Sequence, residues 1–368
     1  MRVAFVSPFV IQGGAERYLS LLLDGLERDW IARIYFLADG PLVGELHERG
    51  YPLEVVPTGP GPLAILRSAL LLRRELRRLR PDVVHADGIK GALVTTLALA
   101  GTRVPVVWLK CDFSHDGWLA RAVARRCRSI AAVSRAVTET FRDGALEKTT
   151  VVPFGLPEAA VDRERGRAAV RGLVGEGSGP VLGLVGRLDP HKGHREVLAV
   201  LPRLRERHDV RAVFVGADDP AHPGYREQLA AEIAAAGLEG AVALPGFRGD
   251  AVELIAGCDA LVIPSVTSRG GLGKEGFSLV ALEGMGVGTP VVAYDHGGPP
   301  EVLGDCGLLV PPGDREALGD ALLRLLEDGD LRERLAQCGR RRARERFSLS
   351  AMIEAMESRY REALAAVR

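Results

Sequence analysis

The chain has 368 residues, of which 47% are hydrophobic and 26% are charged. This length fits two ordinary α/β domains better than one, and the composition excludes a disordered chain. The 48 basic and 48 acidic residues cancel, so no overall field attracts nucleic acid, and any preference for anions must be local.

The predicted elements follow a regular rhythm along the chain. Short β-branched runs alternate with longer helical patterns, which is typical of parallel βαβ units. A polar, glycine-rich stretch at 171–180 has the composition of a loop between domains, and the same rhythm restarts after it. In the first part, helices are expected over 14–28, near 44, over 63–79, and from residues 91, 118 and 135.

The predicted fold class is therefore α/β, with two doubly wound parallel-sheet domains covering residues 1–172 and 173–368. Each strand of the second domain ends in a loop rich in glycine or proline, and ligands of such sheets bind outside the carboxyl ends of the strands. The segment of about 348–367 is amphipathic, and we expect it to form a last helix that packs back toward the N-terminal domain.

The cysteines and the N-terminal segment indicate in which cellular compartment the protein is expected. The N-terminal segment lacks an extended apolar core and a cleavage site, so it predicts a first strand rather than a signal peptide. No apolar run reaches the ~18–20 residues of a bilayer span. The cysteines show neither paired nor zinc-like spacing, so we expect a cytoplasmic protein with reduced packing cysteines. These are Cys111, Cys127, Cys258, Cys306 and Cys338.

The segment 273–283 contains two glutamates, Glu275 and Glu283, around the expected start of a helix near Phe277. Free N–H groups and the positive end of the helix dipole form an anion site suited to a diphosphate. One carboxylate can accept hydrogen bonds from sugar hydroxyls and the other from ribose hydroxyls. The alternative is a helix with one capping and one solvated glutamate.

The loop 185–194 carries Arg187 and Lys192, one of only five lysines in the chain. Fixed cations in a water-poor cleft stabilise a leaving diphosphate without a metal ion. Asp218 and Asp219 are adjacent and do not present a usual chelating pair, so we expect no metal site. The alternative for Arg187 and Lys192 is a solvated loop.

Three features of the first domain are less specific. Gly13 and Gly14 permit a close backbone approach at a helix N-terminus, where an acceptor or a phosphate could bind, although a tight turn explains them almost as well. His85 and His115 each lie at the end of a predicted strand or in its loop. Structural or solvated histidines are commoner than catalytic ones.

Together these motifs resemble the large family-four retaining glycosyltransferases over nearly the whole chain. The resemblance implies the GT-B fold, in which two Rossmann-like domains face each other, and sugar transfer that retains anomeric configuration without a metal ion. The matching positions are Gly13-Gly14, His85, Ser134, Gly155, Gly186-Arg187, Lys192-Gly193, Pro264-Ser265, Glu275-Gly276-Phe277, Glu283 and Gly297-Gly298.

The resemblance also assigns roles to residues. It implies that Arg187 and Lys192 bind the donor diphosphate, Glu275 the transferred sugar and Glu283 the ribose. The implied catalytic set is Arg187, Lys192, Glu275 and His115, and the implied acceptor or phosphate loop contains Gly13, Gly14 and His85. The implied donor site comprises Gly186, Arg187, Lys192, Ser265, Glu275, Gly276, Phe277, Ser278, Leu279 and Glu283.

Two departures from the family pattern stand out. Family members usually carry a histidine in the loop after the strand 105–113, where this chain has Lys110-Cys111-Asp112. Either His115 fills that role or the role is altered. The chain also inserts residues 266–274 between Pro-Ser and Glu-Gly-Phe, beside the expected sugar pocket.

The predicted function is transfer of a hexose-type sugar from a nucleotide-diphosphate sugar, with UDP favoured over GDP, to a hydroxyl acceptor that the sequence does not identify. No cofactor is expected, because the nucleotide-sugar is a co-substrate. A nucleotide-sugar epimerase and a non-catalytic nucleotide-sugar-binding protein are the alternatives. Gly271, Gly273 and Gly276 spell a dinucleotide fingerprint, but it follows a late strand rather than the first βα turn, so a dehydrogenase is rejected.

The segment 66–80 combines leucines with six arginines. Such a helix can lie on an anionic membrane surface, which would make the protein peripheral at the inner membrane face. The alternative is a surface helix whose leucines pack on the sheet. No nucleic-acid partner is expected.

Overall fold

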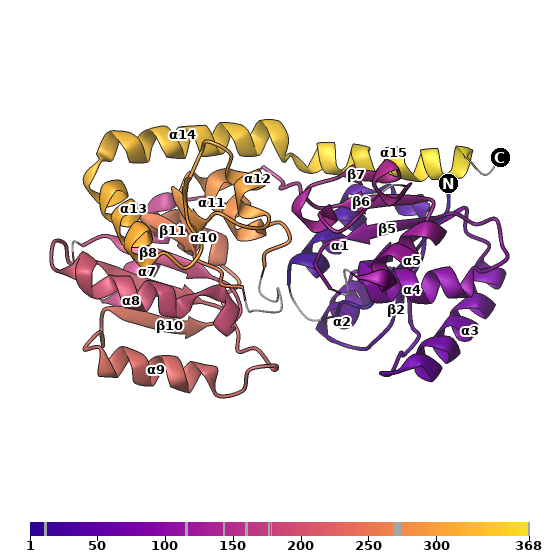
Figure 1. Ribbon diagram of the computed structural model, residues 1–368, viewed down its shortest axis with the longest axis horizontal. Helices are drawn as coiled ribbons and strands as arrows, with labels where there is room; N and C mark the ends of the chain where they lie inside the picture. The colour runs from indigo at the N-terminus through magenta and orange to yellow at the C-terminus, as the bar shows by residue number, and fades with distance from the viewer. Residues whose placement is uncertain are drawn as a thin grey trace. The chain divides into compact units, whose positions relative to one another are not determined.

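The computed structural model describes residues 1–10, 13–114, 117–142, 144–158, 161–175, 177, 179–267 and 274–366. The chain divides into two compact units (Figure 1). Unit 1 consists of Met1–Gly155 with Leu349–Arg368, and unit 2 consists of Leu156–Ser348. The C-terminal segment thus returns to unit 1 after unit 2 is complete.

Unit 1 is built on a sheet of seven strands among the described residues, in the order β3-β2-β1-β4-β5-β6-β7, and all its pairings are parallel. Its strands are β1 (Val3–Ser7), β2 (Ile31–Phe36), β3 (Leu53–Val55), β4 (Val83–Asp87), β5 (Val106–Lys110), β6 (Ser129–Ala132) and β7 (Thr149–Val151). The predicted parallel α/β organisation is confirmed for this unit.

Alternation along the central strands of unit 1 supplies two apolar faces, because successive side chains of a strand point to opposite sides. Ala4 and Val6 join one core cluster with residues of α3, α4 and α5. Phe5 points the other way, toward Tyr360 of α15. The helices are α1 (Gly14–Gly25), α2 (Pro41–Glu48), α3 (Pro62–Leu79), α4 (Gly88–Ala98), α5 (Trp118–Arg126), α6 (Gly144–Glu147) and α15 (Leu349–Ala365), with short 3-10 helices η1 (Arg28–Trp30) and η2 (Ala136–Thr138).

The helix expected from residue 135 is wrong in extent. The chain forms only η2 there, where the Ser134 hydroxyl accepts from the Val137 amide, and the four-residue α6 follows. Thr138 and Thr140 lose side-chain freedom in a helix, so this segment has little intrinsic helical preference.

Unit 2 has a second parallel sheet, with six strands among the described residues in the order β10-β9-β8-β11-β12-β13. Its strands are β8 (Val181–Val185), β9 (Arg211–Val215), β10 (Val242–Gly246), β11 (Ala260–Ile263), β12 (Val291–Tyr294) and β13 (Leu308–Val310). With this sheet, the prediction of two doubly wound parallel-sheet domains is confirmed.

Two helical layers cover the sheet of unit 2. Leu182 and Leu184 belong to a large cluster with side chains of α8, α9 and α13, whereas Val181 belongs to a smaller cluster with α7 and α10. The sheet is thus buried on both faces, as parallel sheets are. The helices are α7 (Arg163–Val174), α8 (His194–Arg205), α9 (Tyr225–Ala235), α10 (Ala251–Gly257), α11 (Leu279–Val287), α12 (Pro299–Leu303), α13 (Arg315–Glu327) and α14 (Gly329–Arg346), with the 3-10 helix η3 (Pro190–Lys192).

The division between the units falls at residues 155 and 156, one helix before the boundary expected at 172. The reason is α7, which packs on α10 of unit 2 through two facing glycines. A Cβ on Gly166 would lie 2.3 Å from the Glu253 carbonyl oxygen, and one on Gly257 would lie 2.3 Å from the Gly166 backbone. The composition of 171–180 resembles a linker, but residues up to Val174 are helical.

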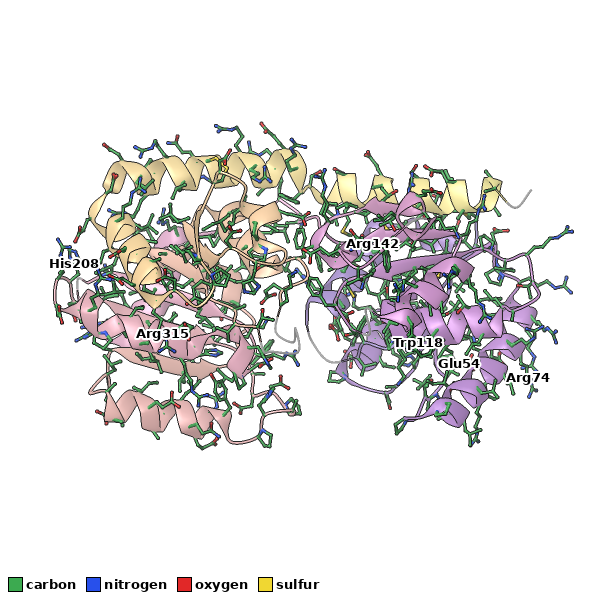
Figure 2. All side chains as sticks on the ribbon, viewed as in Figure 1. Glu54, Arg74, Trp118, Arg142, His208 and Arg315 are labelled. Atoms are coloured by element: carbon green, nitrogen blue, oxygen red, sulfur yellow. A yellow bond between two sulfur atoms is a disulfide. The ribbon has the colours of Figure 1, made fainter. Side chains whose placement is uncertain are left out.

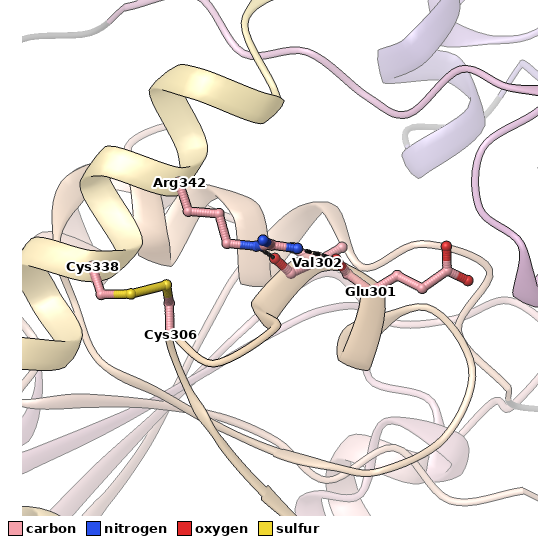
Figure 3. The surroundings of a disulfide bond; sticks show 5 residues. All are labelled: Glu301, Val302, Cys306, Cys338 and Arg342. Carbon is pink, nitrogen blue, oxygen red and sulfur yellow. Dashed lines mark hydrogen bonds between the residues drawn. A yellow bond between two sulfur atoms is a disulfide. The ribbon is translucent and has the colours of Figure 1, made fainter.

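Cys306 and Cys338 form a disulfide with an S–S distance of 2.05 Å (Figure 3), so the expectation that they are reduced packing residues is wrong. The fold brings the residue after α12 beside α14, where the two Cα atoms are 5.2 Å apart. On α14, Arg342 also donates to the carbonyl oxygens of Glu301 and Val302, at 2.8 Å each. Cys111, Cys127 and Cys258 are free thiols.

Helix α3 has leucines on two faces. Leu72 and Leu76 are buried in the core of unit 1, as expected of a helix that packs on its sheet. Leu63, Leu66 and Leu70 are 82%, 51% and 60% exposed, on a helix that also carries exposed arginines such as Arg74, labelled in Figure 2. Among the helices that the structure describes, none has both the length and the apolar character needed to span a membrane.

The contact of α7 with α10 predicts that Gly166→Ala destabilises the protein by about 1–3 kcal/mol, because the added methyl group meets backbone that cannot rotate away. A Cβ on Gly172, in the same helix, would have no neighbour within 4 Å. Gly172→Ala should therefore stabilise by about 0.5–1 kcal/mol. Urea unfolding of both variants measures the difference; equal effects would contradict the packing argument.

Candidate functional site

The sheet of unit 2 has a topological switch point between β8 and β11. From β8 the chain proceeds outward to β9 and β10, and from β11 it proceeds the other way to β12 and β13. Open α/β sheets bind their ligands at a switch point of this kind, beside the loops that follow the carboxyl ends of the two central strands. Arg187 and Lys192 follow β8, and Ser265 and Glu275 follow β11.

An ion pair joins these two loops. Lys192 Nζ lies 2.6 Å from Glu275 Oε1, and the Ser265 hydroxyl donates to the same oxygen at 3.0 Å. Burial alone would raise the pKa of Glu275, but the charge of Lys192 and the hydrogen bonds from Lys192 and Ser265 outweigh it and lower that pKa. Glu275 is thus a carboxylate at neutral pH, and its side chain keeps 17% exposure.

Glycines let the backbones of the loops meet. Gly193 has a φ of +78°, and a Cβ there would lie 1.9 Å from the Pro264 carbonyl oxygen. A Cβ on Gly298 would lie 2.4 Å from Phe277 Cα, and the Gly298 amide donates to the Glu275 carbonyl at 2.8 Å. Glycine is required at both positions because no side chain fits between the loops.

The second cation of the site comes from the same loop as Lys192. Arg187 Nη1 lies 3.3 Å from Asp219 Oδ2, and its side chain is 47% exposed. The aliphatic stem of Lys192 passes 3.4 Å from the position of a Cβ on Gly186, next to Arg187 in sequence. The structure therefore places Gly186, Arg187 and Lys192 at one end of the sheet, together with Glu275.

Helix α11 begins at Leu279, two residues later than expected, after Ser278 with a φ of +80°. A left-handed serine is uncommon, and such strain is concentrated at ligand sites. The first-turn amides of a helix have no intrahelical acceptor and favour anions. Gly276 and Phe277 directly precede this turn, and Glu283 lies half-buried about 6 Å further along the helix axis.

Sequence inspection missed His296, which follows β12 and belongs to the same edge. Its Nε2 lies 2.6 Å from the Ser265 carbonyl oxygen. Burial raises the pKa of Glu275, and His296 is the smallest of the influences that lower it, after Lys192 and Ser265. It also missed a group formed by Asp189, His191 and His222. The sequence could have indicated these four residues by their place after predicted strands, because each of them follows the carboxyl end of a strand.

Unit 1 has its own switch point, between β1 and β4. Gly13 is the extended N-cap of α1 and Gly14 its first residue, both exposed. Asp87 ends β4 with 1% exposure, and its Oδ2 atom is buried without a hydrogen-bond partner among the described residues. This edge of unit 1 therefore carries a carboxylate with spare acceptor capacity.

His85 lies inside unit 1 with no exposed surface. Its Nε2 is 2.7 Å from Asp87 Oδ1 and its Nδ1 is 2.8 Å from the Tyr360 hydroxyl. A carboxylate only accepts, so Nε2 donates to Asp87 and Nδ1 accepts from Tyr360. Both ring nitrogens are thus used in a buried chain from β4 to α15, which fits a structural role and leaves neither nitrogen open to an acceptor.

Two family models match the chain. "Glycosyltransferase Family 4" matches residues 12–159, and "Glycosyl transferases group 1" matches residues 173–342. The chain belongs to the group 1 glycosyltransferases. The crystal structure of Anabaena HepE with UDP and glucose is similar to this glycosyltransferase, with a TM-score of 0.84 and 25% identity over 97% of this chain and 98% of that one. The GT-B fold prediction is confirmed.

Curated relatives of the glycosyltransferase differ in what they act on. MMP alpha-(1->4)-mannosyltransferase of Mycolicibacterium hassiacum is 32% identical over 67% of this chain and 57% of its own length. D-inositol 3-phosphate glycosyltransferase of Saccharomonospora viridis is 35% identical over 56% of this chain and 50% of its own. The matched regions thus span only about half the length of these relatives.

The structure describes only some of the residues at which the chain departs from the family pattern. Lys110 is buried, with Nζ donating to the Asp112 carbonyl at 2.7 Å. Burial raises the pKa of the neighbouring Cys111 well above its ordinary value, so this thiol of the glycosyltransferase stays protonated at neutral pH. His115 lies outside the described residues, as do 268–273 of the insertion 266–274.

The buried chain through His85 predicts that Tyr360→Phe destabilises the glycosyltransferase by about 1–3 kcal/mol, because His85 Nδ1 is left without a donor. Tyr225→Phe is the matched control: its hydroxyl is buried with no hydrogen-bond partner among the described residues, so its loss should be close to neutral. Thermal and urea unfolding compare the two. Equal destabilisation would show that the hydroxyl of Tyr360 contributes nothing specific.

Proposed function

We propose that this chain is a retaining glycosyltransferase that moves a hexose-type sugar from a nucleoside diphosphate sugar to a hydroxyl acceptor. UDP is the favoured nucleotide, because HepE, which is similar over nearly its whole length, was crystallised with UDP and with UDP-glucose. The observation that carries the proposal is the Lys192–Glu275 pair at the switch point of unit 2. This pair puts a lysine ammonium beside a carboxylate, and we assign the ammonium to the diphosphate and the carboxylate to sugar hydroxyls.

In this proposal the diphosphate binds to the first-turn amides of α11, between Lys192 and Arg187. Lys192 is 28% exposed and Arg187 47% exposed, so both can turn from their carboxylate partners toward a phosphate. Glu275 then accepts from the transferred sugar, and Glu283 from the ribose. Ser265 holds Glu275 in place through the hydrogen bond to Oε1.

The proposed reaction is a displacement on the front face of the sugar. The bond between the anomeric carbon and the phosphate oxygen breaks while the acceptor oxygen bonds to the same face of that carbon. The departing phosphate oxygen takes the acceptor proton, and nucleoside diphosphate leaves. Arg187 and Lys192 stabilise its developing charge, so the proposed chemistry requires neither a metal ion nor a cofactor.

This mechanism predicts that Lys192→Ala lowers turnover by about 10²-fold, the cost of removing one fixed group that stabilises transition-state charge. The proposal that UDP is the nucleotide predicts a second result. UDP-sugars should raise the melting temperature of the wild type more than GDP-sugars do, since a ligand of the folded state raises apparent stability. This shift should be much smaller in Lys192→Ala.

Arg195→Ala is the control, because Arg195 is a nearby cation that pairs instead with Glu232 at 2.7 Å. Turnover should survive that change. Unchanged turnover in a folded Lys192→Ala protein would refute the role of the lysine. Epimerised nucleotide-sugar without transfer to any acceptor would favour an epimerase, and binding without turnover would favour a non-catalytic protein.

We also propose that α3 contacts an anionic membrane surface. Its exposed leucines lie among exposed arginines, and apolar insertion combined with attraction to anionic lipid is the basis of interfacial helix binding. The other leucine face, through Leu72 and Leu76, packs on the sheet, so one helix serves both purposes.

This contact predicts co-sedimentation with phosphatidylglycerol vesicles at low salt, and weaker binding at high salt. Leu66→Glu with Leu70→Glu should abolish it. Leu146→Glu, which changes a leucine of α6 that is 45% exposed, should not. If the wild type stays in the supernatant with anionic vesicles at low salt, α3 is only a surface helix.

A further inference from the structure

Three side chains next to the donor loop are arranged as metal ligands. Asp189 and His191 lie in the loop after β8, and His222 lies in the loop between β9 and α9. One ligand atom of each lies within 4.8 Å of the other two. The two loops follow neighbouring strands of the sheet, so the fold rather than the sequence spacing brings the three side chains together.

The distances between the ligand atoms are close to those around a small ion of the zinc type. Asp189 Oδ1 lies 2.9 Å from His191 Nδ1 and 3.8 Å from His222 Nδ1. In a tetrahedral zinc site with bonds of about 2.0–2.2 Å, neighbouring ligand atoms are about 3.3–3.5 Å apart. The observed distances lie on either side of this range, and the distance between the two histidine ligand atoms is at most 4.8 Å. The 2.9 Å contact is a hydrogen bond between Asp189 and His191, which the ion would replace as the side chains rotate around it.

The surroundings of His222 independently indicate a bound cation. Its Nδ1 is buried and has no hydrogen-bond partner among the described residues, although it lies 3.8 Å from Asp189 Oδ1 and 3.7 Å from Asp219 Oδ2. These distances are too long for hydrogen bonds. A buried polar atom without a partner is costly, and a cation between this nitrogen and the carboxylates would satisfy it.

The surroundings favour a divalent transition metal over magnesium or calcium. Two imidazoles and one carboxylate are the ligand types that zinc and its neighbours prefer, whereas magnesium and calcium prefer oxygen ligands. Asp219, 5% exposed, stands behind His222 and also pairs with Arg187 at 3.3 Å. Because Asp219 lies 3.7 Å from the same His222 Nδ1 atom, its carboxylate adds negative charge beside the ion rather than orienting the imidazole through its other nitrogen.

We propose that Asp189, His191 and His222 bind one divalent transition-metal ion such as Zn²⁺. The ion takes no part in sugar transfer. It fastens the loop that carries Arg187 and Lys192 to the loop between β9 and α9, and so stabilises the folded state of unit 2. The proposal does not depend on which sugar is transferred, or on whether transfer occurs.

The test uses the full chain without an affinity tag, stripped of metals by a chelator. Calorimetric titration with Zn²⁺ should show one equivalent bound, and Co²⁺ should give the visible absorption of a site with nitrogen and oxygen ligands. Zn²⁺ should raise the melting temperature of the wild type, and Mg²⁺ should not. His191→Gln and His222→Gln should each weaken Zn²⁺ binding by about tenfold or more.

His208→Gln is the matched control. His208, labelled in Figure 2, follows α8 and lies 3.2 Å from Glu327, but it belongs to no group of three ligands among the described residues. Its loss should leave Zn²⁺ affinity unchanged. Equal Zn²⁺ affinity in the wild type and in a folded variant with both His191→Gln and His222→Gln would overturn the proposal. If that variant does not fold, absence of Co²⁺ absorption and of a Zn²⁺-dependent melting shift in the wild type overturns it.

Discussion

The Lys192–Glu275 pair is the interaction on which the candidate site of unit 2 depends. It connects loops that follow β8 and β11, the two strands between which the chain reverses its direction across the sheet. A half-buried carboxylate is costly without a cation, and Lys192 supplies that cation to Glu275 at 2.6 Å. The pair therefore fixes where the loops lie before any ligand binds, and it keeps both charges near the start of α11.

The two units use the same topology differently. In unit 2 the edge at the switch point is lined by charges with partial exposure, such as Arg187, which a ligand can reach. In unit 1 the corresponding edge leads into a buried chain that runs from Asp87 through His85 to Tyr360. The C-terminal helix α15 is tied to unit 1 through that chain, so polar groups there stabilise the fold while those in unit 2 remain open to a ligand.

Several residues show why sequence patterns do not predict which side chains come together. His85 follows the pattern of a cleft histidine, yet strand alternation turns it toward Phe5 and α15 rather than toward an opening. Cys306 and Cys338 are 32 residues apart with no paired spacing, and only the folded chain, in which Arg342 of α14 donates to two carbonyl oxygens of α12, makes them neighbours. His191 and His222 likewise look unrelated until adjacent strands bring their loops together.

The two parallel α/β units could be predicted from the sequence, because alternation of apolar runs with helical periods is a local property that burial on both faces of a sheet enforces. The same pattern indicated which loop residues lie at the carboxyl ends of strands, including Arg187, Lys192, Ser265 and Glu275. Which of them touch, where unit 1 ends and which histidine is buried became known only from the folded chain. Those outcomes depend on contacts between segments far apart in the chain, such as Gly166 against Gly257, and no local pattern encodes the partner of a side chain.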